Sequence, residues 1–121
     1  MRYGNFYVDA GYGHGLDLLR RAERPIAIFA GSDPQALGVL RAARRLGIVV
    51  PEELSVIGYD NLPVASWADP ELTTVNQPLR EMADAATRML LDMARGAEPA
   101  STRIDLVTEL VVRMSTAPPP R

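Results

Sequence analysis

The feature that most constrains the fold is an apolar run, a helical pattern and a second apolar run between residues 26 and 60. Residues 26–30 (IAIFA) are continuously apolar, which predicts a strand covered on both faces. Residues 55–59 (SVIGY) predict a second strand. Two strands joined through a helix by short connections form a βαβ unit, in which the strands are parallel. We therefore expect an α/β fold in which helices flank a parallel sheet.

The helix between these strands has recognisable start and stop signals. Asp33 can cap its beginning, and Pro34 suits the first helical position because its missing N–H has no partner there. The helix is expected to run to about Leu46, where Gly47 ends it. Its apolar face has helical spacing and consists of Ala36, Val39, Leu40 and Ala43.

Three further elements are expected along the chain. Residues 12–22 predict a short helix, and residues 79–95 predict a long helix with one apolar stripe. Residues 105–113 predict a final, largely buried strand. Residues 61–75, which contain two prolines, are expected to be irregular. The tail, residues 118–121, is expected to be disordered.

Composition and charge exclude several functional classes. The 121 residues correspond to about one domain, and 47% of them are apolar. The net charge is −2 and the arginines are scattered, so the chain by itself is a poor nucleic-acid binder. Cysteine is absent, and we expect neither a metal nor a cofactor. Without an apolar stretch of membrane-spanning length or a recognisable signal peptide, a cytoplasmic protein is expected.

The glycine-rich stretch GYGHG, residues 11–15, is weak support for a dinucleotide site because it does not follow a strand. We interpret it as a loop that enters a helix. His14 is the single histidine of the chain. No serine or cysteine nucleophile lies near His14 in the sequence, and no residue is placed to orient the imidazole, so a catalytic triad is not indicated. A single histidine also makes a poor metal site.

Two polar pairs follow the predicted parallel strands, Ser32 with Asp33 and Asp60 with Asn61. Ligands of open α/β sheets bind in the crevice at the carboxyl ends of the strands, where carboxylates can accept hydrogen bonds from sugar hydroxyls. The alternative is that Asp33 caps its helix and Asn61 shapes a turn. We favour capping for Asp33 and the crevice for Asp60.

Two further features leave alternatives open. The two carboxylates raise the possibility of a glycoside hydrolase, but nothing else in the sequence supports it, and we expect no enzyme and no catalytic residue. Phe6 and Trp67 lie in irregular segments. Each can either stack on a sugar ring or fill a gap in a core or interface.

The sequence resembles the C-terminal half of the effector-binding domain of the lactose-repressor (LacI/GalR) family of transcription regulators. The specific motifs are AGSDPQALGVLRAARRLG, PEELSVIGYDN and LTTVNQP within residues 25–78. The ending TELVVRMSTAPP is similar to the closing strand and tail of that family, and GNFYVDAGYGHGLDLL to the preceding segment. The resemblance covers essentially the whole chain.

The resemblance implies a two-lobed periplasmic-binding-protein-like fold that holds a sugar or another small metabolite between its lobes. It implies that residues 1–117 form the C-terminal lobe. The ligand-binding positions that it implies are Phe6, which stacks on the ligand, Ser32 with the following Asp33, the aspartate Asp60, and Gln77 near the crossover between lobes. Ser32 stands where asparagine is commoner in the family.

The resemblance also implies what surrounds the chain. The DNA-binding helix-turn-helix domain and the N-terminal lobe of the family are absent, so a fragment or truncated product is expected, which binds DNA only through that missing domain. Helix 79–95 would normally pack on the N-terminal lobe, and we expect it either to fold back on its own lobe or to pack on another copy. Homodimers would form through helices 11–22 and 34–46. Two alternatives stay open: a fragment of a periplasmic-type sugar-binding protein, and a product without ligand function.

Overall fold

The computed structural model describes residues 7–98, 101 and 103–119. The chain divides into two units, residues 1–76 with 110–121 and residues 77–109. The elements in chain order are α1 (Val8–Leu19), β1 (Ala27–Phe29), α2 (Asp33–Leu46), β2 (Ser55–Asp60), α3 (Pro63–Trp67), β3 (Thr73–Asn76), α4 (Leu79–Ala94) and β4 (Glu109–Val111).

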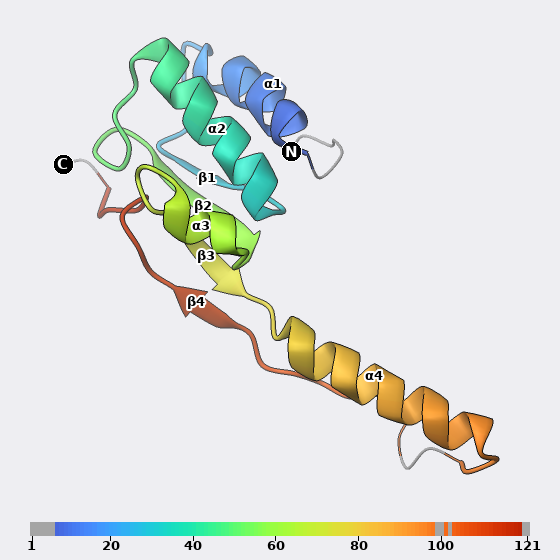
Figure 1. Ribbon diagram of the computed structural model, residues 1–121. Helices are drawn as coiled ribbons and strands as arrows, with labels where there is room; N and C mark the ends of the chain where they lie inside the picture. The colour runs from blue at the N-terminus through green and yellow to red at the C-terminus, as the bar shows by residue number, and fades with distance from the viewer. Residues whose placement is uncertain (1–6, 99–100, 102, 120–121) are drawn as a thin grey trace. The chain divides into compact units, whose positions relative to one another are not determined.

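The sheet has the strand order β1-β2-β3-β4 (Figure 1). β1 and β3 both pair with β2 in parallel, with Phe29 opposite Ile57 and Asp60 opposite Asn76. The predicted βαβ unit, β1-α2-β2, is therefore confirmed. The fold is α/β with helices that flank the sheet, as expected.

The core lies between the sheet and the helix pair α1 and α2, which lie side by side (Figure 1). Val56 of β2 and Leu54 and Leu72 beside the strands are almost completely buried. The predicted apolar face of α2 is confirmed, because Ala36, Val39, Leu40 and Ala43 are all buried. Gly47 ends this helix in the left-handed conformation, as the sequence indicates.

α1 begins earlier than predicted and includes the whole GYGHG stretch. The interpretation of GYGHG as a loop that enters a helix was therefore wrong. The reason is helix packing. A Cβ atom on Gly11 would overlap the backbone of Gln35, and one on Gly38 would overlap the backbone of Val8 and Tyr12. The glycines therefore let two helix backbones approach each other closely, which outweighs the low helix propensity of glycine.

Residues 61–75 are more regular than predicted, because they contain α3 and most of β3. Pro63 stands in the first turn of α3, where it is tolerated. β3 has no apolar run, but its buried threonines bond their hydroxyls to protein partners. Thr73 Oγ1 lies 3.0 Å from Thr116 Oγ1, and Thr74 Oγ1 donates to Asp33. Satisfied hydroxyls make a buried strand possible without an apolar pattern.

The two outer strands are shorter and more exposed than predicted. β1 comprises three residues, and the Phe29 side chain is 64% exposed. In place of a largely buried strand over residues 105–113, only Glu109–Val111 is a strand, and Leu110 is exposed. An apolar pattern shows which side chains can be buried, whereas burial itself requires a covering element.

The second unit contains α4, and its residue range confirms the long helix predicted for residues 79–95. None of its residues is buried. The large exposed apolar side chains of this helix are Leu79, Met82, Leu90, Leu91 and Met93. No helix within the described residues is both long and apolar enough to cross a membrane. What covers the apolar stripe of α4 stays a prediction.

Candidate functional site

The start of α2 is capped by Ser32, one residue earlier than predicted. The backbone of Ser32 is extended, and its hydroxyl accepts a hydrogen bond from the Gln35 N–H at 3.3 Å. Asp33 is the first residue of the helix and therefore does not serve as its cap. Ser32 is also 98% buried, since its relative exposure is 2%. Its hydroxyl is thus held in one orientation at the carboxyl end of β1.

Asp33 joins three elements at this edge of the sheet. Its carboxylate is completely buried: Oδ2 accepts from the Leu62 N–H at 2.7 Å, and Oδ1 accepts from Thr74 Oγ1 at 2.5 Å. The absence of a side chain at Gly58 leaves room for Oδ1, because a Cβ there would overlap that atom. Asp33 therefore fixes the start of α2 to the ends of β2 and β3.

Asp60 and Asn61 form an unusual turn at the carboxyl end of β2. Asp60 has φ of 103° and Asn61 has φ of 55°, and they are the only non-glycine residues with positive φ in the part of the chain that the structure describes. Such backbone conformations are uncommon for residues with a side chain, although Asn and Asp adopt them more readily than most. They cluster at ligand-binding and active sites, where surrounding contacts maintain the strain.

The electrostatic environment of Asp60 differs from that of an ordinary surface carboxylate. Partial burial raises the pKa of Asp60 above its usual value, and the negative charge of Asp33 raises it further. The side chain keeps some exposure to solvent. Perturbed carboxyl groups of this kind are frequent at functional sites.

Asp60→Asn is expected to increase the stability of the folded chain at neutral pH but not in acid. The pKa of Asp60 in the folded state lies above the unfolded value of 3.8. The folded state therefore binds the proton more tightly, and this contribution is fully present below the unfolded pKa. It is lost as the pH rises through the folded pKa, a loss that asparagine avoids. Urea unfolding of both proteins as a function of pH measures the difference; a pH-independent difference would contradict the raised pKa.

The structure contains a polar network of Asn61, Asn76 and Arg113 that the sequence did not predict. Asn61 Nδ2 donates to Asn76 Oδ1 at 3.0 Å, and Asn61 Oδ1 accepts from Arg113 Nη2 at 2.8 Å. Arg113 Nη1 also donates to the Leu72 carbonyl at 2.7 Å. No sequence signal connects Asn61 and Arg113, which are 52 residues apart.

The structure brings three of the five predicted ligand-binding residues together. Ser32, Asp33 and Asp60 lie at the carboxyl ends of the neighbouring parallel strands β1 and β2. Gln77 is the first residue of the second unit, and its Nε2 donates to the Met82 sulfur at 3.4 Å. Phe6 lies outside the described residues. No cluster of three or more His, Cys, Asp or Glu side chains suited to a metal ion occurs among the described residues.

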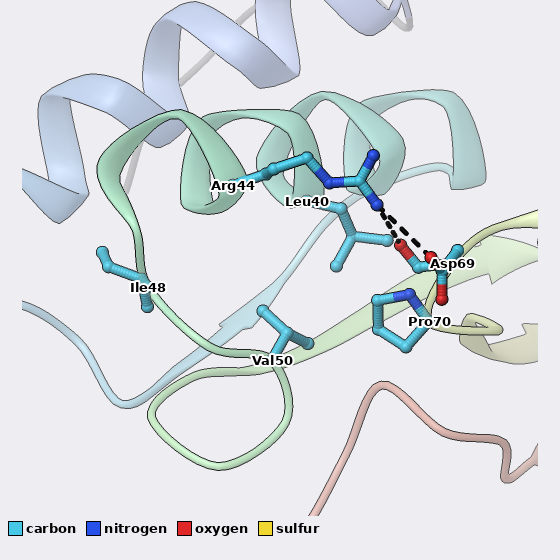
Figure 2. A pocket seen from close by; sticks show the side chains of 6 residues that line it. All are labelled: Leu40, Arg44, Ile48, Val50, Asp69 and Pro70. Atoms are coloured by element: carbon cyan, nitrogen blue, oxygen red, sulfur yellow. Dashed lines mark hydrogen bonds and ion pairs between the residues drawn. The ribbon is translucent and has the colours of Figure 1, made fainter.

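A separate hollow of about 180 Å³ lies beside the C-terminal half of α2 (Figure 2). It contains none of the predicted ligand-binding residues. Arg44 crosses it, with Nη2 at 3.2 Å from the Asp69 carbonyl oxygen and 3.5 Å from Asp69 Oδ2. The other lining residues are Leu40, Ile48, Val50 and Pro70. An adjoining hollow of about 210 Å³ continues along the same face of α2.

Residues 3–116 match the family of periplasmic binding protein-like domains. The chain belongs to this family. Among its curated relatives is the HTH-type transcriptional repressor PurR of Erwinia tasmaniensis, which is 38% identical over 117 residues. That match covers 97% of this chain but 34% of the relative. The chain thus spans about a third of the length of the curated repressors that it matches.

Solved structures of transcription regulators have the same fold. The transcriptional regulator CelR–cellobiose complex superposes with a TM-score of 0.88 at 42% identity, over 93% of this chain and 35% of that one. A LacI family transcriptional regulator from Enterococcus faecium with bound ribose has a TM-score of 0.85 at 33% identity, over 94% and 42%. For the dimeric Lac repressor the TM-score is 0.88 at 29% identity, over 96% and 42%. The predicted resemblance to the effector-binding domain of LacI/GalR regulators is confirmed.

Proposed function

We propose that this chain is the effector-sensing and dimerising portion of a LacI/GalR-type transcriptional regulator, and that its effector is a sugar or a related small metabolite. The observation that carries the proposal is the strained, partly exposed Asp60, which ends β2 beside Ser32 and Asp33. The sugar complexes of two similar regulators support the ligand class.

The chemistry of Asp60 suits a hydroxylated ligand. Burial and the neighbouring Asp33 both disfavour its negative charge, which is why the pKa of Asp60 is raised. A sugar hydroxyl that donates to the carboxylate would compensate this cost, because hydrogen bonds to the charged form stabilise it. In this proposal Ser32, which follows β1, is a second ligand-binding residue. Phe6 and Gln77 complete the set of ligand-binding residues.

The other proposed partners follow from the family. The regulator binds DNA through a helix-turn-helix domain outside these 121 residues and acts in the cytoplasm, where DNA is accessible. The HTH-type repressor PurR supports that proposal, because the match covers only 34% of its length. The net charge of −2 agrees with it, since a surface that binds DNA is usually basic. Homodimers form through α1 and α2; the dimeric state of the similar Lac repressor supports this part.

A hydrolytic function is disfavoured by the geometry of Asp33. A glycosidase needs two carboxyl groups that reach the scissile bond. Asp33 is completely buried, and both of its oxygens accept hydrogen bonds from the protein. It therefore cannot act with Asp60 on a substrate without breaking the links between α2, β2 and β3. The relatives named as transcriptional regulators agree with a sensor rather than an enzyme or a periplasmic transport protein.

Isothermal titration calorimetry with a panel of sugars that includes cellobiose and ribose tests the proposal. We expect weak binding, with a Kd on the order of 1 mM (about −4 kcal/mol), because this portion supplies only part of a two-lobed pocket. Asp60→Asn should weaken binding about tenfold or more, because an amide cannot accept as many hydrogen bonds. Asp84→Asn, which removes an exposed carboxylate from α4, should leave the affinity unchanged. Equal affinities of the wild type and Asp60→Asn would contradict the role of Asp60.

A further inference from the structure

Asn61, which follows Asp60, is bonded to residues near both connections between the two units. The chain leaves the first unit after Asn76 and returns at Leu110. The Asn61 amide donates to the side chain of Asn76 at 3.0 Å. Its oxygen accepts from Arg113 at 2.8 Å. One side chain beside the candidate ligand-binding aspartate therefore contacts the outgoing and the returning segment.

Arg113 is itself fixed in place by β3. Its guanidinium donates through Nη1 to the Leu72 carbonyl at 2.7 Å and through Nη2 to Asn61. Its backbone N–H donates to Thr73 Oγ1 at 2.9 Å. The side chain is only partly exposed. A planar guanidinium can hold two acceptors at a fixed separation, which the single ammonium group of a lysine cannot do.

The Asp60–Asn61 turn needs such fixed contacts. Residues with a side chain in rarely populated backbone regions are strained, and they keep that conformation only where surrounding contacts maintain it. The Asn61 N–H also lies 3.3 Å from Thr74 Oγ1, so backbone and side chain of this residue are both held. The contacts made by Asn61 therefore stabilise the backbone conformation of the turn that contains Asp60.

We propose that Asn61 and Arg113 are positioning residues, which hold the Asp60 carboxylate in place and link it to the two segments that connect the units. This inference rests on the proposed role of Asp60 in effector binding. Because energetic coupling is reciprocal, an effector at Asp60 and the arrangement of the connecting segments then bias each other. Asp60 is thus joined through its covalent neighbour Asn61, and the two hydrogen bonds of the Asn61 side chain, to Asn76 and Arg113.

The test is the pKa of Asp60, measured from the ¹³C chemical shift of its carboxyl carbon during an NMR pH titration of the full chain. Arg113→Lys keeps the positive charge but loses the two-point contact, and Asn76→Ala removes the other partner of the Asn61 side chain. In both variants the turn should relax, so that Asp60 gains water and moves away from Asp33. Its pKa should then fall toward its ordinary value. Asn76→Ala gives an independent result if Arg113→Lys does not fold.

Ser115→Ala is the matched control. The Ser115 hydroxyl donates to the Val56 carbonyl at 2.6 Å and accepts from the Thr73 N–H at 2.8 Å, so it also fastens the C-terminal segment to the sheet. It makes no described contact with the Asp60 turn. Ser115→Ala should lower the melting temperature without a change in the pKa of Asp60.

The outcomes separate the positioning role from the proposed function. A pKa of Asp60 that stays unchanged in Arg113→Lys and Asn76→Ala, or that falls equally in Ser115→Ala, would overturn the positioning role. That result would leave the sugar-binding test of wild-type and Asp60→Asn protein unaffected. Conversely, a wild-type chain that binds none of the sugars would refute the proposed function, whereas the titration would still decide whether Asn61 and Arg113 position Asp60.

Discussion

Asp33→Ala is expected to destabilise the first unit by about 2–6 kcal/mol, because each of two donors left unpaired costs about 1–3 kcal/mol. The two donors are the Leu62 N–H and the Thr74 hydroxyl, which now bond to the completely buried carboxylate. A total stability of about 5–15 kcal/mol is typical of a small domain, so this loss would remove a large share of the stability. Urea unfolding followed by circular dichroism measures the change.

Two neighbouring substitutions calibrate this result. Ser32→Ala removes the cap of the same helix, which typically costs about 0.5–2 kcal/mol. Asp33→Asn retains one acceptor oxygen but points an amide N–H₂ group at a donor, and it should fall between the two alanine variants. If Asp33→Ala costs no more than Ser32→Ala, Asp33 does not link α2 to β2 and β3 in the way the hydrogen bonds indicate.

Gly38→Ala is expected to be the second most damaging change, with a loss of about 3 kcal/mol or slightly more. A Cβ at this position of α2 would overlap the Val8 carbonyl and the Tyr12 N–H group of α1. Both obstacles are backbone atoms, which cannot rotate aside as a flexible side chain does. The added methyl group therefore has to separate the two helices, and the packing between them is lost.

Gly13→Ala provides the matched control for this overlap. Gly13 also lies within a helix, but no atom within 4 Å would meet its Cβ. Alanine has the higher helix propensity, so this variant should gain about 0.5–1 kcal/mol. Thermal unfolding of both variants distinguishes close packing from a general intolerance of substitution. A stable Gly38→Ala protein would contradict the close approach of α1 and α2.

The βαβ unit was predictable because its signals are local. The apolar runs identify β1 and β2, and Pro34, Gly47 and the apolar spacing define α2 to within one residue at its start. The choice between Ser32 and Asp33 as the cap was not determined by the sequence. Both side chains can cap a helix, and the buried carboxylate of Asp33 is required elsewhere, by Leu62 and Thr74.

The missed features depend on residues that are distant in the sequence. β3 lacks an apolar pattern because Thr74 is buried against Asp33, 41 residues away. The bond between Asn61 and Arg113 has no sequence signature at all. Gly11 of α1 and Gly38 of α2 can be explained only by the close approach of the two helices. The exposure of β4 depends on which elements cover it. Hydrophobic periodicity reports none of these relations.

The candidate site was predictable only in part. The end of a parallel strand is a place where ligands bind, so the position of Asp60 follows from the βαβ unit. Its individual role, together with those of Phe6, Ser32, Asp33 and Gln77, came from the family resemblance and stays a prediction. The positive φ angles of Asp60 and Asn61 were visible only in the structure, because they depend on contacts with β3 and Arg113.

The most direct measurement is to map sugar binding residue by residue, with ¹H–¹⁵N NMR spectra of the chain during titration with each sugar of the panel. We predict that the largest chemical-shift changes occur at Gly31, Ser32, Asp60 and Asn61, and that in Asp60→Asn they require about tenfold more sugar or still higher concentrations. Changes centred on Leu40, Arg44 and Asp69, the hollow beside α2, would contradict the placement of the effector site at the carboxyl ends of β1 and β2. So would spectra that no sugar alters.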